Sequence, residues 1–511
     1  MAAGLDNPPF STAWQVGNGR RGYLIQNALV LLSTLIVARL VLSIDYAAVY
    51  ALVLLLAFLA FVAQPRYGLY ALFGVCLLFE GAFSSEDVFQ APSFFLTASP
   101  QTTLHLSGVV LTPIELFVVL VAAAWLARGA MERRFDFRAG ELGAPALFLS
   151  IGLGWGILRG LMTNANVNLI FWESRFLVAM IICYILAANL IRKRGHVQSL
   201  LSLILVVVGF AGIEGIWRKV ALVDAGKLGT VPEFWYAHDD VVMWGLLLLL
   251  VFGVFAFGGP RWQRVVGPVL ALATAVTMLI SERRAGYVAV IIAFVAFSII
   301  LFRAKRKSFW RMAVPVIIAG AVYMPIFWNN TGMLGQPARA VRSISDPDPR
   351  DASSNAWRDM EAINVRATIQ SNPLLGIGFG NRFLQVVTVP DISFFPFWDL
   401  EAHHDVLWVW MKTGALGFIA FFGFVLAGVM RGAWMAKHLK DPNFRVFAML
   451  TVCAVVMSMV FSYVDLGLVG NRVPMVLGIM LGALSVLPRI EKEQSTQTEL
   501  MPTQAIGTRS W

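Results

Sequence analysis

Uncharged apolar runs of about twenty residues recur along the whole sequence, and they limit the folds that are available to it. A run of that length crosses roughly 30 Å of hydrocarbon as an α-helix. Hydrophobic residues make up 58% of the chain and charged residues 14%, whereas globular proteins carry about 45–50% and about 25%. A soluble core cannot cover so much apolar surface. The sequence therefore predicts a polytopic membrane protein, and it lacks the short alternating strands of a membrane barrel.

The predicted fold is all-α, with about 12–14 transmembrane helices of the usual spanning length. The expected spans lie near residues 23–43, 46–64, 67–82, 108–127, 142–160, 168–190, 197–216, 239–258, 264–281, 285–302, 312–327, 405–430, 446–464 and 471–488. The three cysteines, Cys76, Cys183 and Cys453, fall inside these spans without paired spacing. That placement favours buried apolar side chains over a disulfide or a metal site.

Basic residues gather in every second loop, which predicts a cytoplasmic N-terminus. The clusters are Arg128, Arg133, Arg134 and Arg138; Arg192, Lys193 and Arg194; Arg261 and Arg264; Arg303, Lys305, Arg306, Lys307 and Arg311; Arg431, Lys437, Lys440 and Arg445. The net charge of +10 is therefore mostly a topology signal. This distribution indicates a lipid bilayer, not a nucleic acid, as the partner of the positive charge.

The same threading divides the chain into five segments. We expect a cytoplasmic tail over 1–22, a first part of the bundle over 23–327, a long extracytoplasmic loop over 328–403, the last spans over 404–488 and a cytoplasmic tail over 489–511. The long loop exceeds the length, roughly 60 residues, to which the charge rule applies.

Helical spacing within the long loop predicts a short helix over residues 356–370. Its apolar positions are Trp357, Met360, Ile363 and Ala367, and Arg358 and Arg366 fall on another face. Asn372-Pro373 ends the helix, because a residue before proline is disfavoured in the α region. Such a segment is typical of a helix lying at the membrane surface or of one packed on the spans.

Charged residues recur at the outer ends of the predicted spans. A charged side chain within the hydrocarbon is unfavourable, by about 2.5–3.5 kcal/mol at a helix centre, so the positions of these residues are informative. They are Glu173 and Arg175, Glu214 and Arg218, Arg283 and Arg284, and Asp465 and Arg472. Guanidinium groups stay charged and bind phosphate oxygens bidentately, so the arginines indicate a site for an anion such as a pyrophosphate. The alternative is contact with lipid headgroups or local pairing, for instance of Arg175 with Glu173.

Two motifs in the long loop invite readings that their context disfavours. Gly376 to Asn381 is glycine-rich, but no strand precedes it and its spacing is not that of a dinucleotide-binding loop. We expect a tightly packed turn there. Asp346 and Asp348 offer oxygen ligands for a divalent metal, but Asp-Pro is also a turn signal, and we favour the turn.

His403 and His404 lie just before an apolar span, between Glu401 and Asp405. A neutral imidazole at pH 7 can act as a general base, whereas a histidine in a loop is commonly structural. The pair is the strongest catalytic candidate in the sequence, with Glu401, Asp405, Arg358 and Asp465 as secondary candidates.

Several motifs together resemble the bacterial O-antigen ligase and O-antigen polymerase family. The matching stretches are Asn372-Pro373-Leu374-Leu375-Gly376-Ile377-Gly378-Phe379-Gly380-Asn381, His403-His404-Asp405-Val406-Leu407, Thr413-Gly414-Ala415-Leu416-Gly417 and Arg284-Ala285-Gly286-Tyr287. In this resemblance His403 takes the place of the family's histidine, and His404 replaces an asparagine. Arg284 matches a family arginine better than Arg283 does. A further family arginine is matched by Lys227 or Arg218.

The resemblance implies a membrane glycosyltransferase of the GT-C kind in the inner membrane, with its site on the periplasmic side. It would transfer a glycan from an undecaprenyl-pyrophosphate carrier to an acceptor hydroxyl, such as that of a lipid A-core, without metal or cofactor. His403 or His404 would act as the base. Arg284, Arg283, Arg175, and Arg218 or Lys227 would stabilise the pyrophosphate.

Other functions remain open. A polymerase of the same family extends one lipid-linked glycan with another, and transfer to a protein hydroxyl is a further variant. A flippase for lipid-linked sugars needs polar groups through the bilayer midplane, whereas the charged residues within the spans lie toward the outer side. A metal-dependent transferase would use Asp346 and Asp348.

Overall fold

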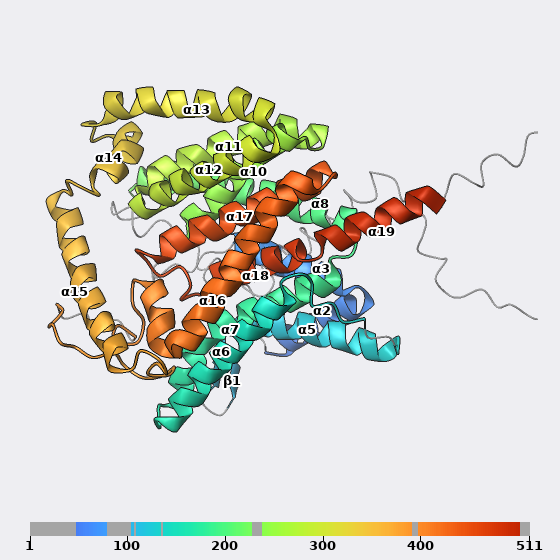
Figure 1. Ribbon diagram of the computed structural model, residues 1–511, viewed down its shortest axis with the longest axis horizontal. Coiled ribbons are helices and arrows are strands. Elements are labelled where there is room, and N and C mark those ends of the chain that lie inside the picture. The colour runs from blue at the N-terminus through green and yellow to red at the C-terminus, as the bar shows by residue number, and fades with distance from the viewer. Residues whose placement is uncertain are drawn as a thin grey trace, which may run out of the picture.

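The computed structural model describes residues 47–78, 104–106, 109–133, 136–226, 238–390 and 397–500. Figure 1 shows a bundle of long helices, which confirms the predicted all-helical membrane fold. Among the described residues the strands are limited to a two-stranded antiparallel ribbon, β1 (Leu104–Leu106) and β2 (Val109–Leu111). The first predicted span, 23–43, lies outside the described residues.

Each expected span in the described part coincides with a helix. The first half of the chain forms α2 (Ala47–Ala63), α3 (Pro65–Leu78), α5 (Pro113–Met131), α6 (Gly143–Met162), α7 (Val167–Leu190), α8 (Arg194–Leu203), α9 (Gly209–Arg218) and α10 (Asp240–Phe257). Two π-helical turns, η1 (Ile204–Val208) and η2 (Lys219–Val223), follow α8 and α9, so that residues 194–221 form one long span.

The second half forms α11 (Arg261–Ser281), α12 (Arg284–Ala304), α13 (Arg306–Phe327), the 3-10 turn η4 (Met333–Gly335), α14 (Gln336–Arg342), α15 (Pro349–Ser371), α16 (Asp405–His438), α17 (Pro442–Ser462), α18 (Arg472–Leu484) and α19 (Leu487–Leu500). In the described part, 11 helices are long and apolar enough to cross a membrane. Two expected spans, 46–64 and 67–82, correspond to the shorter helices α2 and α3.

One helix begins later than its hydropathy indicates. The span expected from residue 108 starts at Pro113, because the side chain of Glu115 accepts a hydrogen bond from the backbone N–H of Thr112 at 2.7 Å. Thr112 and Glu115 form a capping box, and proline is well suited to the first helical position. The ribbon β1–β2 takes up the residues before it.

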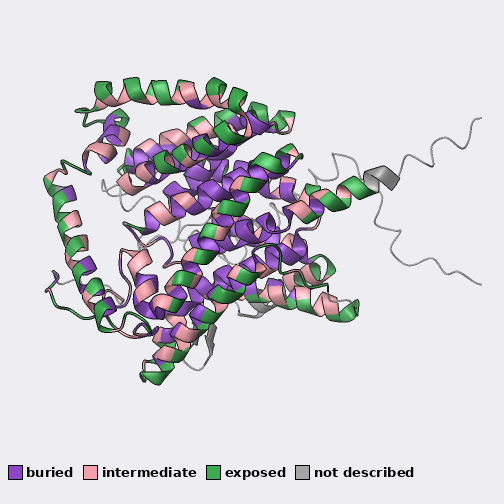
Figure 2. Cartoon of the chain, in the orientation of Figure 1, coloured by how far each residue is buried: buried purple, intermediate pink, exposed green. Residues whose placement is uncertain are grey.

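The centre of the bundle is formed by α7, α10, α17 and α18, which are buried over most of their length (Figure 2). The closest packing joins α7 to α18, where Gly478 and Gly482 lie against the backbone carbonyls of Met180 and Tyr184. Small residues at such a contact allow two membrane helices to approach closely. The cysteines Cys76, Cys183 and Cys453 are buried and free, as predicted.

The interior of α16 is broken at Gly414, which has φ 68° and ψ −171°. The glycine-rich turn fits into this break. The N–H groups of Ile377 and Gly378 donate to the carbonyls of Met411 and Lys412 at 2.8 and 3.1 Å. The N–H of Ala415 donates to the carbonyl of Leu374 at 3.1 Å. The turn thus satisfies backbone groups that a broken membrane helix exposes, and the expected tight packing is confirmed.

A fully buried ion pair between α7 and α16 holds the glycine-rich turn in place. The Lys412 ammonium lies 2.7 Å from the Glu173 carboxylate, and both side chains are 0% exposed. Lys412 also donates to the carbonyl of Asn381, while Glu173 accepts from the backbone N–H of Gly380 and from the indole of Trp408. We call Glu173, Lys412 and these partners the buried lock. It joins α7, α16 and the glycine turn.

The helix expected over 356–370 is confirmed as α15, which starts earlier, at Pro349. Asp348 caps it by accepting the N–H of Asp351 at 2.9 Å, so the turn reading of the Asp346–Asp348 motif is confirmed. The predicted apolar face is not the buried one: Ile363 is 44% exposed, whereas Glu361, Asn364 and Val365 are buried. The side-chain amide oxygen (Oδ1) of Asn364 accepts the N–H groups of Val386 and Val387, which draws this polar face inward.

Candidate active site

His403 is held by a buried carboxylate of α15. The Oε2 atom of Glu361 accepts the backbone N–H of His403 at 2.7 Å, and Oε1 lies 3.3 Å from its Nδ1. The edge of the Trp357 ring meets the imidazole at a centroid distance of 4.6 Å. Glu361 is 2% exposed, whereas the His403 side chain is 31% exposed. Because Nδ1 faces the carboxylate, Nε2 is the nitrogen left to meet a substrate.

A second histidine, His238, joins Asp465 to Arg283. Its Nδ1 lies 3.0 Å from Oδ2 of Asp465, and its Nε2 lies 3.2 Å from Nη1 of Arg283. Burial opposes ionisation of Asp465, but adjacent His238, together with the charges of His403 and Arg358, lowers the pKa of this carboxyl below its usual value. Asp465 therefore stays ionised among these basic side chains, within electrostatic range of His403.

The N-terminal end of α15 meets the start of α12 through Arg284. Nη2 of Arg284 lies 3.0 Å from Oδ1 of Asp351, which is buried and also lies 3.5 Å from Arg339. Arg339 in turn pairs with Asp348 at 2.6 Å. The Arg284 guanidinium is thus shared between a carboxylate and the surface, since its side chain is 22% exposed.

Asp351, Arg358 and Glu361 lie along one face of α15, because they are spaced at two turns and then one. Asp351 and Glu361 are about 15 Å apart along the axis, at about 1.5 Å per residue. The helix therefore sets the distance between the arginine at one end, Arg284, and the histidine at the other, His403. Arg358 lies between them. Within the described part of the chain its Nη1 donates to Ser354 at 3.1 Å, and its buried Nε has no partner.

We call this set the reaction group. Its members are Arg283, Arg284, His238, Arg358, Glu361, His403 and Asp465. Five parts of the fold supply them: the start of α10, the start of α12, helix α15, the loop before α16, and the turn between α17 and α18 (Figure 1).

Arg175 and Glu401 belong to a neighbouring group around Trp172. Arg175 does not form the local pair with Glu173 that was the alternative to anion binding: it pairs with Glu115 of α5 at 3.2 Å, and its guanidinium stacks on Trp172 at 3.5 Å. Glu173 is committed to the buried lock. The indole N–H of Trp172 donates to Glu401 at 3.2 Å. Burial raises the pKa of Glu401 to about 7, and the nearby charge of Glu173 adds to this effect.

The two candidates for the further arginine position differ in what can be described. Arg218 forms an i,i+4 ion pair with Glu214 on α9 at 2.9 Å, and its side chain is 10% exposed. The carboxylate of Glu214 lies within electrostatic range of Asp240, which pairs with Arg472. Arg218 is therefore already occupied by an anion in this structure. Lys227 lies outside the described residues.

His404 and Asp405 have structural partners. His404 is the N-cap of α16: its Nδ1 accepts the N–H of Leu407 at 3.4 Å, and its ring packs on Tyr463 at 4.3 Å. Burial lowers the pKa of His404. Asp405 is fully buried and accepts the backbone N–H groups of Gly467 and Leu468. Both residues anchor the loop that carries Asp465 beside the loop that carries His403.

Sequence reasoning missed Glu361 and His238. The signal for Glu361 is its position on the face of α15 that also carries Asp351 and Arg358, which is visible once helical spacing is applied to the polar residues. The signal for His238 is a histidine followed by two aspartates at the start of a span. Neither residue stands in one of the motifs that carried the resemblance.

A comparison with protein families matches residues 269–422 to the family described as O-Antigen ligase. The chain carries an O-antigen ligase domain. The resemblance seen in the sequence is thereby confirmed over this segment, and the protein is a membrane enzyme that carries this domain. No curated protein matched the chain. The matched segment contains Arg283, Arg284, α15 and His403, whereas His238 and Asp465 lie outside it.

Proposed function

We propose that this O-antigen ligase family enzyme transfers a glycan from undecaprenyl pyrophosphate to an acceptor hydroxyl, such as that of a lipid A-core. The reaction takes place at the outer face of the inner membrane, and segment 328–403 covers the site. The family supplies the lipid-linked glycan as the substrate class. The basic loops at the other end of the bundle support this orientation.

His403 is the proposed general base. Glu361 holds Nδ1, so Nε2 accepts the proton of the acceptor hydroxyl as its oxygen attacks the anomeric carbon. The bond from that carbon to the pyrophosphate oxygen breaks, and undecaprenyl pyrophosphate leaves with the electron pair. Attack opposite the leaving group inverts the anomeric centre.

The arginines of the reaction group are the proposed stabilisers of the leaving pyrophosphate. Charge develops on its oxygens as the bond breaks, and fixed cations stabilise it without reorganising. Arg358 supports this role most directly, because among the described residues its hydrogen-bond partner is a neutral serine and its Nε has none. Arg283 meets a histidine. Arg284 is held by Asp351, so the incoming pyrophosphate has to compete with that carboxylate.

One observation carries the proposal: a single face of α15 holds Arg358 beside the Glu361 that orients His403. One rigid element therefore fixes the base and a cation that has no carboxylate ion-pair partner among the described residues. Preorganised geometry of this kind contributes much of the rate of a transfer reaction.

The test is reconstitution of the purified protein with a lipid-linked glycan and two alternative acceptors, a lipid A-core and a second lipid-linked glycan. Product on the lipid A-core supports ligase activity. Product only on the lipid-linked glycan identifies a polymerase, and transfer to neither overturns the proposal. A chelator arm tests metal independence, and we expect an unchanged rate.

A further inference from the structure

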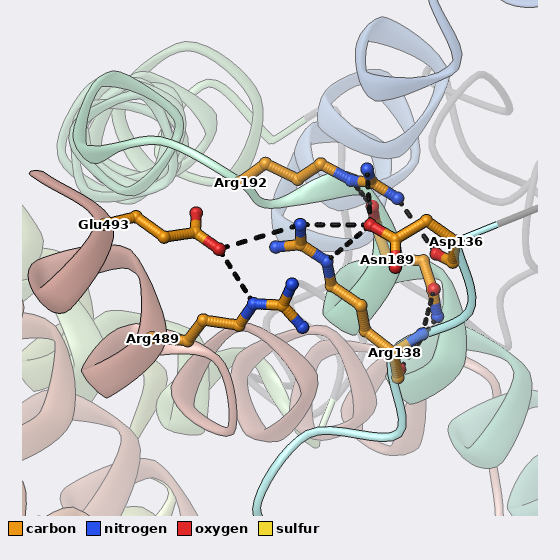
Figure 3. Close-up of polar contacts among 6 residues, drawn as sticks. All are labelled: Asp136, Arg138, Asn189, Arg192, Arg489 and Glu493. Carbon is orange, nitrogen blue, oxygen red and sulfur yellow. Dashed lines mark hydrogen bonds and ion pairs between the residues drawn. The ribbon is translucent and has the colours of Figure 1, made fainter. Parts of the chain in front are cut away.

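Three arginines converge beside α19 (Figure 3), which lies at the opposite end of the bundle from α15 (Figure 1). Arg138 precedes α6, Arg192 follows α7 and Arg489 lies on α19. Asn189, beside this cluster, is about 21 Å along α7 from Arg175, at about 1.5 Å per residue. The carboxylates that face the arginines are Asp136 and Glu493. Three guanidinium groups thus share two carboxylates.

The backbone of Arg138 is fixed from two sides. The side chain of Asn189 accepts the N–H of Arg138 at 2.7 Å and donates to its carbonyl at 3.1 Å. The hydroxyl of Tyr184 donates to the carbonyl of Ala139 at 2.6 Å. Gly140 follows with φ 70° and lies against Ser485, where no Cβ would fit. These contacts hold the backbone that carries the Arg138 side chain in one position.

The ion pairs do not use all of the guanidinium N–H donors on the side of the cluster that faces Arg489. Arg192 takes Asp136 at 3.1 Å, and Arg138 shares the same carboxylate through Nε. The Arg138 side chain is only 10% exposed, yet in the described part of the chain its Nη1 has no hydrogen-bond partner. Arg489 meets Glu493 through Nε at 2.8 Å. Figure 3 shows the guanidinium groups of Arg138 and Arg489 facing each other beside Glu493.

We propose that Arg138 and Arg489 bind the phosphate of an anionic phospholipid at this end of the bundle, with Arg192 keeping Asp136 engaged. Guanidinium groups bind phosphate oxygens bidentately, and Nη1 of Arg138 together with the terminal nitrogens of Arg489 offers donors from two directions. The lipid would fix α19 to the loop before α6. This site is separate from the glycan transfer proposed above.

A lipid fits better than a free anion because of what surrounds the arginines. Phe137, next to Arg138, is 54% exposed, which provides an apolar contact for an acyl chain. The cluster lies where a membrane-spanning helix, α7, ends, at the depth of the headgroups. It also lies at the end where the basic loops gather, and basic pockets between helices at that side are typical binding sites for anionic headgroups.

The experiment measures the apparent melting temperature of the full-length protein in a neutral detergent while a short-chain phosphatidylglycerol is added. Short-chain phosphatidylcholine and inorganic phosphate are titrated in parallel. We expect phosphatidylglycerol to raise the melting temperature and the other two to leave it unchanged. Arg138→Gln and Arg489→Gln should each raise the half-saturating concentration of phosphatidylglycerol about fivefold, since one basic residue near an anionic surface contributes about 1 kcal/mol.

Arg431→Gln is the matched control, because Arg431 is an exposed arginine on α16 that pairs with Glu141 and lies outside the cluster. It should respond to phosphatidylglycerol as the wild type does. An equal response to phosphatidylcholine overturns the proposal, as does an equal response to phosphate. An unchanged response in both Arg138→Gln and Arg489→Gln also overturns it.

Glu493→Gln keeps the test decisive if Arg138→Gln does not fold. This change removes the carboxylate that competes with the phosphate for Arg489 and Arg138. Lipid binding at this place predicts a lower half-saturating concentration of phosphatidylglycerol in Glu493→Gln. If the five charged side chains only hold α19 in place, Glu493→Gln has a lower melting temperature and no higher affinity for phosphatidylglycerol. That result overturns the proposal.

Discussion

The buried lock and the reaction group are both clusters of charge in a membrane protein, but they differ in how completely the charges are paired. In the lock, Glu173 and Lys412 are 0% exposed and also bond to backbone and indole groups. In the reaction group, His403 is 31% exposed, and among the described residues the buried Nε of Arg358 lacks a hydrogen-bond partner. Similar chemical groups thus form a closed network in one place and an open one in the other.

The difference indicates what each cluster is for. A buried charge is tolerated when its partners are complete, and its removal then costs stability. An incompletely paired cluster stabilises the fold less, but its free donors and exposed imidazole remain available to a substrate. We therefore assign a structural role to the buried lock and propose a catalytic role for the reaction group. The changes below test this division, from the largest expected effect to the smallest.

Lys412→Met should destabilise the protein by about 3–5 kcal/mol, because it leaves Glu173 as an unpaired buried charge. The measurement is the melting temperature of the purified protein. In the double variant Glu173→Gln/Lys412→Met the charge is gone, and part of the loss should be recovered. A single variant as stable as the wild type would mean that the lock does not hold the glycine turn.

Arg358→Gln should lower the transfer rate about 10²–10³-fold, the effect expected when one fixed donor to a developing negative charge is removed. Its melting temperature should change little, because Ser354 is its hydrogen-bond partner in the described part of the chain. The matched control is Arg366→Gln on the same helix, where the side chain is exposed. If both variants lose the same activity, the face of α15 is irrelevant to the reaction.

Glu361→Gln should lower kcat about 10–100-fold and leave the donor KM unchanged, as a share of the about 10²–10⁴-fold that a general base contributes. The amide oxygen can still accept the backbone N–H of His403, so the loop keeps its place. Asp359→Asn, an exposed change on the same helix, serves as the control. A rise in KM with an unchanged kcat would assign Glu361 to substrate binding instead of to the positioning of His403.

Glu401 should produce a pH-dependent stability that disappears in Glu401→Gln. Burial raises the pKa of Glu401 from 4.5 to about 7. The folded protein therefore holds a proton that the unfolded chain releases, and stability falls as the pH rises from about 4.5 to about 7. We expect Glu401→Gln to be more stable than the wild type at pH 8, by about 3 kcal/mol, since each unit of pKa shift corresponds to about 1.4 kcal/mol. At pH 4 the wild type and Glu401→Gln should be equally stable. The same difference in melting temperature between them at both pH values would contradict this prediction.

The helices were predictable because hydropathy over about twenty residues depends on the local sequence alone. The positions of α7, α10 and α17 follow from it, and the glycine turn follows from its motif. The start of α5 was not predictable from hydropathy, because Glu115 caps the helix through a side-chain contact that hydropathy does not register. The face of α15 was assigned wrongly because Asn364 and Glu361 find partners in distant loops, and this reverses the expected apolar side.

The site was predictable only where a motif carried it. His403 and Arg284 stand in recognisable stretches, whereas Glu361 and His238 contribute through contacts across the fold. The pairing of Lys412 with Glu173, and of Arg175 with Glu115, joins helices far apart in sequence. No local pattern fixes which carboxylate an arginine meets, so the closed and open clusters could not be separated before the structure.

The most direct measurement compares His403→Ala with His404→Ala, determining the transfer rate per folded molecule and the melting temperature on the same preparations. The account predicts that His403→Ala loses about 10²–10⁴-fold in rate at nearly unchanged stability. His404→Ala should keep its rate and lose about 0.5–2 kcal/mol of stability, the cost of a helix cap. Equal transfer rates in the two variants would contradict the assignment of the general base to His403 and of a structural role to His404.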